Sequence, residues 1–188
     1  GAGFITSLDS LAQMEIKTSD KTILAGTDLT ISPEIKLNGA NVYNYGTITT
    51  VESTVPKQGS IDGGQDTDTW FNYTVSTLNY VGPLSAFRGK GTSDASATGN
   101  TVNYYRDDAQ QIAGMTYYDV IITSSTGIRI KTLNDDATIG GDLIISGTSQ
   151  FDNGFLSAIS LAGDWINTSS IGDSFVEGFG LVNLNGSA

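Results

Sequence analysis

The sequence predicts an all-β fold of stacked β-repeats, a β-solenoid, on three observations. Apolar residues alternate with polar ones over short runs, as in Val120 and Ile122 or Leu143 and Ile145, which is typical of strands with one buried face. Clusters of Gly, Asn, Asp and Ser separate these runs and favour tight turns. Similar blocks return later in the chain, which is the sequence signature of repeat architectures.

The central part of the chain gives the clearest strands. Tyr118 alternates with the apolar positions that follow it, and Ile128 and Ile130 form the apolar side of the next run, with Arg129 and Lys131 pointing the other way. Turn signals lie at residues 124–127, 134–136, 140–141 and 152–154.

Helix signals are weak by comparison, because Gly occurs 23 times and few runs keep a helical spacing for more than two turns. The exception is Phe4 to Lys17, where Leu8 and Leu11 share a helical face. Met14 and Ile16 fit a strand equally well, so this stretch is open between a short helix and a strand.

Two internal echoes support a repeat structure. The ordered blocks 21–23, 28–32 and 37–44 return as 131–133, 142–146 and 161–167. Residues 102–104 also resemble 182–184. The gaps between blocks differ, as expected if loops of variable length connect the corners of a solenoid.

These blocks resemble the recurring β-repeat of large secreted Bacteroidetes proteins, a group that includes surface adhesins and gliding-motility-associated repeat proteins. The resemblance rests on residues 102–104, 110–112, 114–122, 131–133, 141–148 and 161–167. It covers 99–188 well and 17–50 loosely, and it implies a right-handed parallel β-solenoid. Coils of about 20–25 residues would number about eight. The alternative fold is a Greek-key β-sandwich, which also has short alternating strands.

The predicted organisation is a single β-repeat segment over 1–188, excised from a longer chain because both ends look cut. Residues 52–98 match no repeat and are expected to include an inserted loop region. Asn38, Asn44 and Asn167 fall near expected coil corners, where stacked Asn side chains can form ladders along the axis.

Composition excludes several function classes. A formal net charge of −11 disfavours nucleic acid as a partner. The absence of Cys and His removes thiolate chemistry, the usual general base and the commonest transition-metal ligand. No apolar run approaches the ~20 residues that span a bilayer, so no membrane insertion is expected.

An acidic loop is the candidate metal site. Asp62, Asp66 and Asp68 place three carboxylates in a Gly-bearing segment, and carboxylates are ligands that Ca²⁺ prefers. The loop completes no known calcium motif, so a solvated turn is the competing interpretation.

Paired acids suggest a second chemistry. Asp107 with Asp108, and Asp135 with Asp136, supply the residue type that cleaves glycosidic bonds. Adjacent strand residues face opposite ways, however, which argues against a shared site.

Aromatic residues gather beside the acidic loop. Trp70, Phe71 and Tyr73 suggest either core packing or a carbohydrate-stacking platform. Strand alternation places Phe71 on the opposite face from Trp70. A ligand site, if present, is expected between Ser60 and Arg88.

The favoured function is a non-catalytic structural or adhesive module of a secreted or cell-surface bacterial protein, with no cofactor. Its expected partners are neighbouring repeats of the same parent chain, surface glycans or other cell-surface proteins. The alternative is a glycan- or calcium-binding module centred on 60–88, and a polysaccharide-active β-helix enzyme is the third reading.

Overall fold

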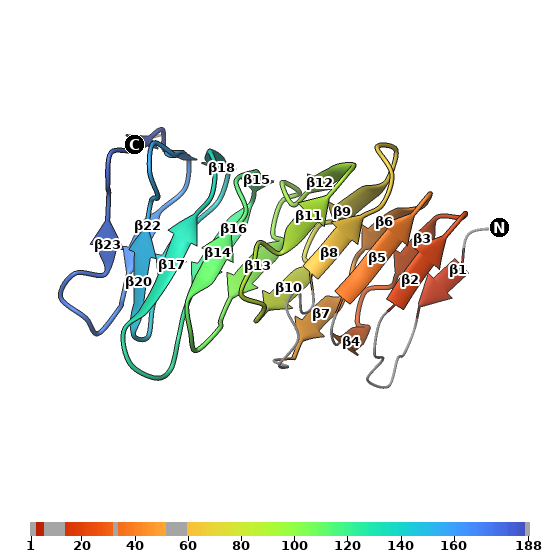
Figure 1. Ribbon diagram of the computed structural model, residues 1–188, viewed down its shortest axis with the longest axis horizontal. Helices are drawn as coiled ribbons and strands as arrows, with labels where there is room; N and C mark the ends of the chain where they lie inside the picture. Colours follow the sequence, from red (N-terminus) through yellow and green to blue (C-terminus); the bar gives the residue numbers. More distant parts are fainter. Residues whose placement is uncertain (1–2, 6–13, 32–33, 52–59, 187–188) are drawn as a thin grey trace.

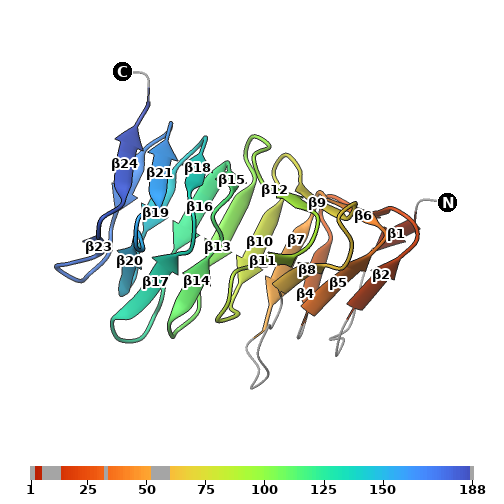
Figure 2. The ribbon, with the colours of Figure 1, turned by 45° about the horizontal axis from the view of Figure 1, so that its top comes forward.

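The computed structural model describes residues 3–5, 14–31, 34–51 and 60–186. Over these residues the chain is a parallel β-solenoid without helix, as predicted, with strands of successive coils lying side by side along the molecule (Figures 1 and 2). Pairings between the named strands are all parallel. A Greek-key β-sandwich is built from antiparallel strands, so that alternative is wrong.

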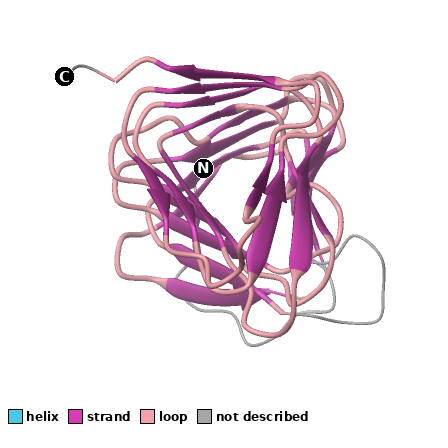
Figure 3. Ribbon diagram, turned by 90° about the vertical axis from the view of Figure 1, so that its left-hand side faces the viewer, coloured by secondary structure: helices cyan, strands magenta, loops and turns pink. Residues whose placement is uncertain are grey.

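Each coil supplies one strand to each of three sides of the solenoid. In one coil these are β5 (Glu34–Asn38), β6 (Asn41–Asn44) and β7 (Thr47–Thr50). Viewed along the axis, the strands surround a common interior (Figure 3). Coil length varies: Val102 pairs with Val120, 18 residues later, whereas Ile48 pairs with Leu78, 30 residues later. The turns absorb this variation while the strands stay in register.

One side is a continuous seven-stranded sheet, here named the spine sheet. Its order is β4 (Asp28–Ile31), β7, β10 (Thr77–Tyr80), β13 (Thr101–Tyr104), β16 (Asp119–Ile122), β19 (Leu143–Ile145) and β22 (Trp165–Asn167).

The other two sides are each divided into an N-terminal and a C-terminal sheet. The N-terminal sheets are β1 (Gly3–Ile5), β3 (Lys21–Ile23), β6, β9 (Thr69–Asn72), β12 (Thr92–Asp94), and β2 (Met14–Lys17), β5, β8 (Ser60–Gly63), β11 (Phe87–Gly89). The C-terminal sheets are β14 (Gln110–Ile112), β17 (Arg129–Leu133), β20 (Ser149–Asp152), β23 (Phe175–Val176), and β15 (Thr116–Tyr117), β18 (Ala137–Ile139), β21 (Ala158–Leu161), β24 (Leu181–Leu184).

Both divisions fall between the same two coils, a place here named the junction. Across it the spine sheet continues through β13 and β16, and the two halves of one divided side share only an isolated bridge between Ala95 and Tyr117. The junction therefore interrupts two of the three sides at one level.

Rows of equivalent side chains fill the interior. The first inward row of the spine sheet is aliphatic and almost fully buried: Leu29, Ile48, Leu78, Val102, Val120 and Leu143. The second row changes character, since Tyr80 and Tyr104 lie between Thr50 and Ile122. Their rings meet edge to face, with centroids 5.9 Å apart. The bulky aromatic interior thus coincides with the junction.

Several expectations need correction. Residues 60–94 contribute strands β8 to β12 to the stack instead of an inserted loop; 52–59 lie outside the described residues. Their polar and aromatic strand residues had hidden the repeat. At the N-terminus, Gly3–Ile5 and Met14–Lys17 are strands, and the remainder of the alternative helix lies outside the described residues.

The matched sequence blocks do form strands, but several matched strands lie on different sides of the solenoid. Strand β4 of the first series and strand β19 of the second both belong to the spine sheet, whereas 21–23 and 131–133 lie on different sides of the solenoid. Residues 102–104 and 182–184 also lie on different sides. All sides use the same apolar alternation, so similar sequence does not fix which side a strand occupies.

Strand β17 is oriented opposite to the prediction. Ile128 and Ile130 are exposed, whereas Lys131 and Leu133 are buried. Lys131 pairs with Phe151, which is also inward. The strand therefore buries the side that carries Lys131 and exposes the side that carries Ile130.

Asparagine ladders form as expected for Asn44. Its Nδ2 donates to Oδ1 of Asn72 on the next coil at 3.0 Å, and Trp70 Nε1 donates to the same oxygen at 2.9 Å. All three residues are buried. On the outside of the spine sheet, Asn79 donates to Thr49 and accepts from Asn103.

The inner ladder yields a stability prediction. Asn72→Ala removes the acceptor of two buried donors, Asn44 Nδ2 and Trp70 Nε1, and we expect it to lower the free energy of unfolding by roughly 2–4 kcal/mol. Urea denaturation measures this change. Asn79→Ala, on the outer ladder, is the control and should cost less than about 1 kcal/mol. Equal losses in both variants would contradict the assigned role of Asn72.

Candidate functional site

Asp68 is the central residue of the acidic loop, and its role is structural. Its Oδ2 accepts hydrogen bonds from the amides of Gly64 and Gln65, at 2.8 and 2.7 Å. Its Oδ1 accepts from Gly39 and Ala40 on the preceding coil, at 2.7 and 3.1 Å. Burial alone would raise the pKa of Asp68, but these amides outweigh it and hold the pKa below its ordinary value. The buried carboxylate joins two turns.

The three acids predicted to bind calcium are not brought together. Asp62 lies on β8, in register with Lys36 and Arg88. Exposed Asp66 lies 3.6 Å from Nζ of Lys90. Within the ranges that the structure describes, no group of three or more acids is placed to hold a metal ion. The loop spacing suggested shared ligation, but the fold commits Asp68 to backbone amides.

The first acid pair caps a neighbouring turn. Asp107 accepts from the amide and the hydroxyl of Ser125, both at 2.5 Å, and the Ser125 hydrogen bonds hold its pKa below the ordinary value. Asp108 accepts a hydrogen bond from the Ala109 amide at 2.8 Å. Its Oδ2 lies 3.7 Å from Nη2 of Arg106, and its Oδ1 lies 4.0 Å from Nη1 of Arg129. The two carboxylates engage different partners and share no site.

The second acid pair follows the same principle. Asp136 accepts from the Ala158 amide of the next coil at 2.7 Å, and Asp135 accepts from the Asp136 amide at 2.9 Å. Both side chains belong to exposed turn residues. The acids considered for glycosidic chemistry are thus used to cap backbone amides.

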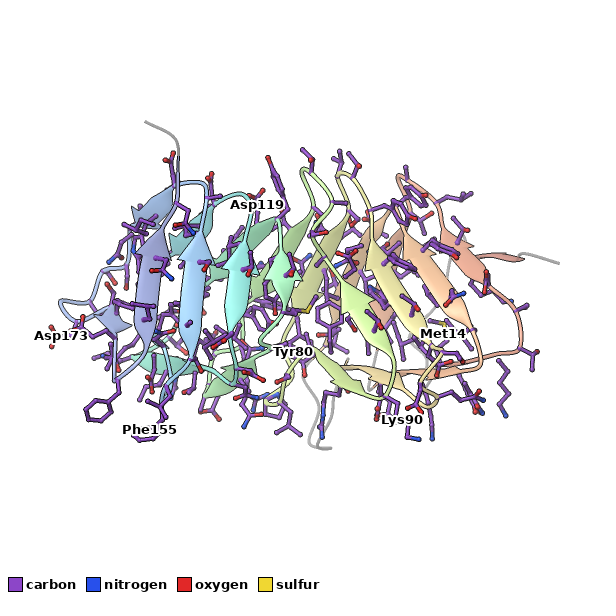
Figure 4. The ribbon with its side chains drawn as sticks, turned by 90° about the horizontal axis from the view of Figure 1, so that it is seen from above. Met14, Tyr80, Lys90, Asp119, Phe155 and Asp173 are labelled. Atoms are coloured by element: carbon purple, nitrogen blue, oxygen red, sulfur yellow. The ribbon has the colours of Figure 1, made fainter. Side chains whose placement is uncertain are left out.

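A further acidic column was missed from the sequence. Oδ1 of Asp119 accepts from the Asp142 amide at 2.8 Å, and Oδ1 of Asp142 accepts from the Asp164 amide at 2.9 Å. Burial raises the pKa of Asp119, and the neighbouring Asp142 charge adds to this rise. Asp119 is the first residue of β16, whereas Asp142 and Asp164 directly precede β19 and β22. The sequence does contain this recurrence of Asp at the start of spine strands. Figure 4 shows Asp119 at the edge of the molecule.

The aromatic cluster separates into a core residue and a surface ladder. Trp70 is fully buried, whereas Phe71 stacks on Tyr43 with centroids 5.4 Å apart and planes 3° apart. Tyr73 stacks on Tyr45 at 4.5 Å and 15°. Tyr73 lies with Phe71 and away from Trp70, as expected for residues two positions apart in an extended chain.

This stacking argues against a sugar platform. A platform presents a free ring face to the sugar, but the stacked rings of this ladder turn their faces toward one another. The partners Tyr43 and Tyr45 precede Phe71 by a full coil, so the sequence window around Trp70 could not reveal them.

Three buried tyrosines organise the junction. The hydroxyls of Tyr104 and Tyr117 lie 2.8 Å apart, and Tyr117 donates to the carbonyl of Ala113 at 2.7 Å. Tyr80 donates to the carbonyl of Leu84 at 2.6 Å. Figure 4 shows Tyr80 in the middle of the molecule. Burial raises the pKa of Tyr104 to about 12, so these hydroxyls stay protonated and available as donors.

Lys131 is the one buried lysine among the described residues. Its Nζ donates to the carbonyl of Arg106, to the carbonyl of Asp108 at 3.1 Å and to Oε1 of Gln110 at 3.2 Å. Burial, helped by the nearby Arg106 charge and opposed by Asp107, lowers its pKa to about 7. The ammonium group closes the turn between β13 and β14.

Comparison with family models, curated proteins and solved structures finds no match for this chain. In the described ranges, no helix is long and apolar enough to cross a membrane.

The Asp68 contacts predict a pH-dependent contribution to stability. Because its folded pKa is depressed, this contribution is present above the ordinary value of 3.8 and is lost as pH falls through the folded pKa. Asp68→Asn should lower the free energy of unfolding by about 1.5–3 kcal/mol at neutral pH. The deficit relative to wild type should shrink at about pH 2. Urea midpoints measure both, with exposed Asp66→Asn as the control. A deficit that is constant with pH would refute the assignment.

Lys131 predicts a stability difference that also rises with pH, but in a higher pH range. An unfolded lysine with its ordinary pKa of 10.5 keeps its proton, whereas the folded side chain loses it above about pH 7. The stability of wild type relative to Lys131→Met should therefore rise between these two values and be constant below them. Urea midpoints at a series of pH values test this. A flat difference would show that the three oxygen acceptors keep the ammonium charged.

Proposed function

We propose that this chain is a non-catalytic structural and adhesive module of a secreted or cell-surface bacterial protein. The stack supplies a rigid scaffold whose coils each contact their neighbours, and its turns present side chains for binding. Three kinds of observation support the proposal.

The carrying observation is an exposed apolar patch on two stacked turns, formed by Phe155, Leu156 and Phe179. These side chains are 76%, 67% and 77% exposed. The two rings contact each other edge to face, with centroids 5.5 Å apart. Phe155 projects from the edge of the molecule in Figure 4. Exposed apolar patches on folded proteins commonly mark interaction sites.

The patch sits on strained and well-anchored backbone. Leu156 has φ of +71°, a conformation that is costly for a branched residue and that is often found at functional positions. The adjoining Asn153 is buried and donates to the Ser157 carbonyl at 3.1 Å. The turn is therefore held with its apolar side chains outward.

The acids considered for catalysis support the non-catalytic part of the proposal. Asp107 and Asp136 accept hydrogen bonds from the backbone of another coil, and Asp108 lies against two arginines. These hydrogen bonds and ion pairs fix the carboxylates in the turns, so they are poorly placed to act on a bound sugar. Surface proteins fit the apolar patch better than glycans, because its rings meet edge to face and form no flat stacking platform, and exposed aromatic residues are enriched at protein–protein interfaces.

Retention of protein-coated beads under flow tests the adhesive role. Beads carrying the 188-residue chain should be retained on surfaces coated with outer-membrane and host-surface proteins. The double variant Phe155→Ser, Phe179→Ser should lose at least tenfold in retention without a lower melting temperature, because both rings are exposed. Val75→Ser is the matched control, since Val75 is 76% exposed but lies apart on another turn. Retention that is unchanged by the double variant would overturn the adhesive patch.

Turnover is tested separately. Wild type should release no reducing sugar from neutral or uronic polysaccharides above a heat-denatured blank. Release that disappears in Asp107→Asn, Asp108→Asn would establish an enzyme and reject the non-catalytic part of the proposal.

A further inference from the structure

A groove opens at the junction, where one side of the solenoid is interrupted. Its walls are residues 87–93, which form β11, the following turn and the first two residues of β12, and residues 113–115 of the next coil. The cavity measures about 290 Å³, close to the lower end of the ~300–1,000 Å³ typical of ligand sites. The volume suits a short segment instead of a large ligand.

Hydrogen bonds hold both walls of the groove in place. Lys90 donates its amide to the carbonyl of Gly63 at 2.8 Å. A Cβ on Gly63 would lie 1.7 Å from the Lys90 carbonyl oxygen, so Gly63 permits the turn to pack directly on β8. On the other wall, the buried Tyr117 hydroxyl holds the Ala113 carbonyl. The groove is thus a built feature of the fold.

Strand β11 ends its sheet at this groove. In the described residues it pairs with β8 on one side and with no strand on the side of the junction. An edge of this kind offers main-chain donors and acceptors to an added strand. The next coil is held nearby by the Gln111 amide, which donates to the Pro83 carbonyl at 3.0 Å before the groove begins.

A column of alternating charges on the outer surface also ends at β11. Successive strands place Glu15, Lys36, Asp62 and Arg88 in one register column. The signs alternate from coil to coil, and neighbouring opposite charges stabilise a parallel ladder. The column ends on the cation Arg88 at the groove. The next position in the alternation calls for an anion, and among the described residues no strand pairs with this edge of β11 to supply one.

The groove lining has the charge expected for an anionic ligand. It contains two cations, Arg88 and Lys90, and no acidic residue, although the chain as a whole has a net charge of −11. Of the two, Lys90 is already paired at 3.6 Å with exposed Asp66 outside the lining, so Arg88 is the principal cation of the groove. Figure 4 shows Lys90 at the edge of the molecule. Arg88 also has a buried Nη1 without a hydrogen-bond partner in the described part of the chain. Its guanidinium retains capacity to bind a carboxylate.

We propose that this groove binds a short, extended, acidic peptide segment of a partner protein. The peptide adds as a parallel strand to the free edge of β11 and places an Asp or Glu side chain next to Arg88. The edge provides affinity through main-chain hydrogen bonds, and the charge column selects the residue at one position. This inference uses residues other than the apolar patch and stands independently of the adhesive proposal.

The test uses two fluorescein-labelled, end-capped pentapeptides with valine at the second and fourth positions. One has a central aspartate and the other a central asparagine. Fluorescence anisotropy with the 188-residue chain should show at least tenfold tighter binding of the aspartate peptide. Amide chemical shifts should change at residues 87–93 and 113–115 and leave the spine sheet unchanged.

Two variants localise the contact. Arg88→Gln should abolish the preference for aspartate over asparagine, whereas Arg129→Gln, on the C-terminal half, should preserve it. Thr92 is exposed at the groove rim, so Thr92→Trp should block both peptides while leaving the melting temperature unchanged. Should Arg88→Gln fail to fold, the Thr92 variant and the peptide pair still decide the question.

Three outcomes would overturn the inference: equal binding of the two peptides, binding unaffected by Thr92→Trp, or shift changes confined to other faces. Trigalacturonate serves as the competing anionic probe. If it binds in the groove more tightly than the aspartate peptide, the site recognises an acidic glycan and the peptide assignment is wrong.

Discussion

Parallel backbone pairing between successive coils is the constraint on which the structure depends. The spine sheet keeps equivalent positions in register over seven strands, although the connecting segments differ widely in length. Register makes each side chain a neighbour of its equivalents one coil away, so residue types accumulate in columns. The Asn44–Asn72 pair, the Tyr43–Phe71 stack and the column ending at Arg88 are three chemical forms of the same geometric rule.

The turns between the sides impose a second constraint, because their backbone amides lack strand partners and need other hydrogen-bond acceptors. This chain meets it with carboxylates that reach across coils. Asp68, Asp107, Asp136 and Asp142 each accept from an amide of another coil. Much of the acidity that suggested metal binding or catalysis is therefore part of the wall of the solenoid.

The sequence predicted the fold class because strand alternation and turn residues are local signals. It could not predict which side of a strand turns inward when both carry apolar atoms, as in β17. There the Lys131 ammonium finds three oxygens from the preceding turn, an environment that exists only after stacking. The prediction of a metal site in the acidic loop failed for a related reason. Asp68 accepts hydrogen bonds from the amides of Gly39 and Ala40, almost thirty residues earlier, and these contacts exist only after the coils stack.

The groove also could not be predicted from local sequence patterns. Its charge column is made of residues one coil apart, and coil lengths vary, so no fixed period connects Glu15 to Arg88. A ligand site was expected, if present, between Ser60 and Arg88, and the proposed groove begins at the end of that interval. The aromatic signal that drew attention there belongs instead to the core and the surface ladder.

The interruption of two sides at one level has a mechanical consequence. Hydrogen bonds between coils run along the axis, so tension applied to the ends loads each coil boundary in series. Most boundaries distribute that load over three sides. At the junction the spine sheet bears it with one bridge and scattered turn contacts. Under tension the molecule should open there first, bending away from its continuous side and exposing the tyrosine-lined interior before any other coil boundary yields.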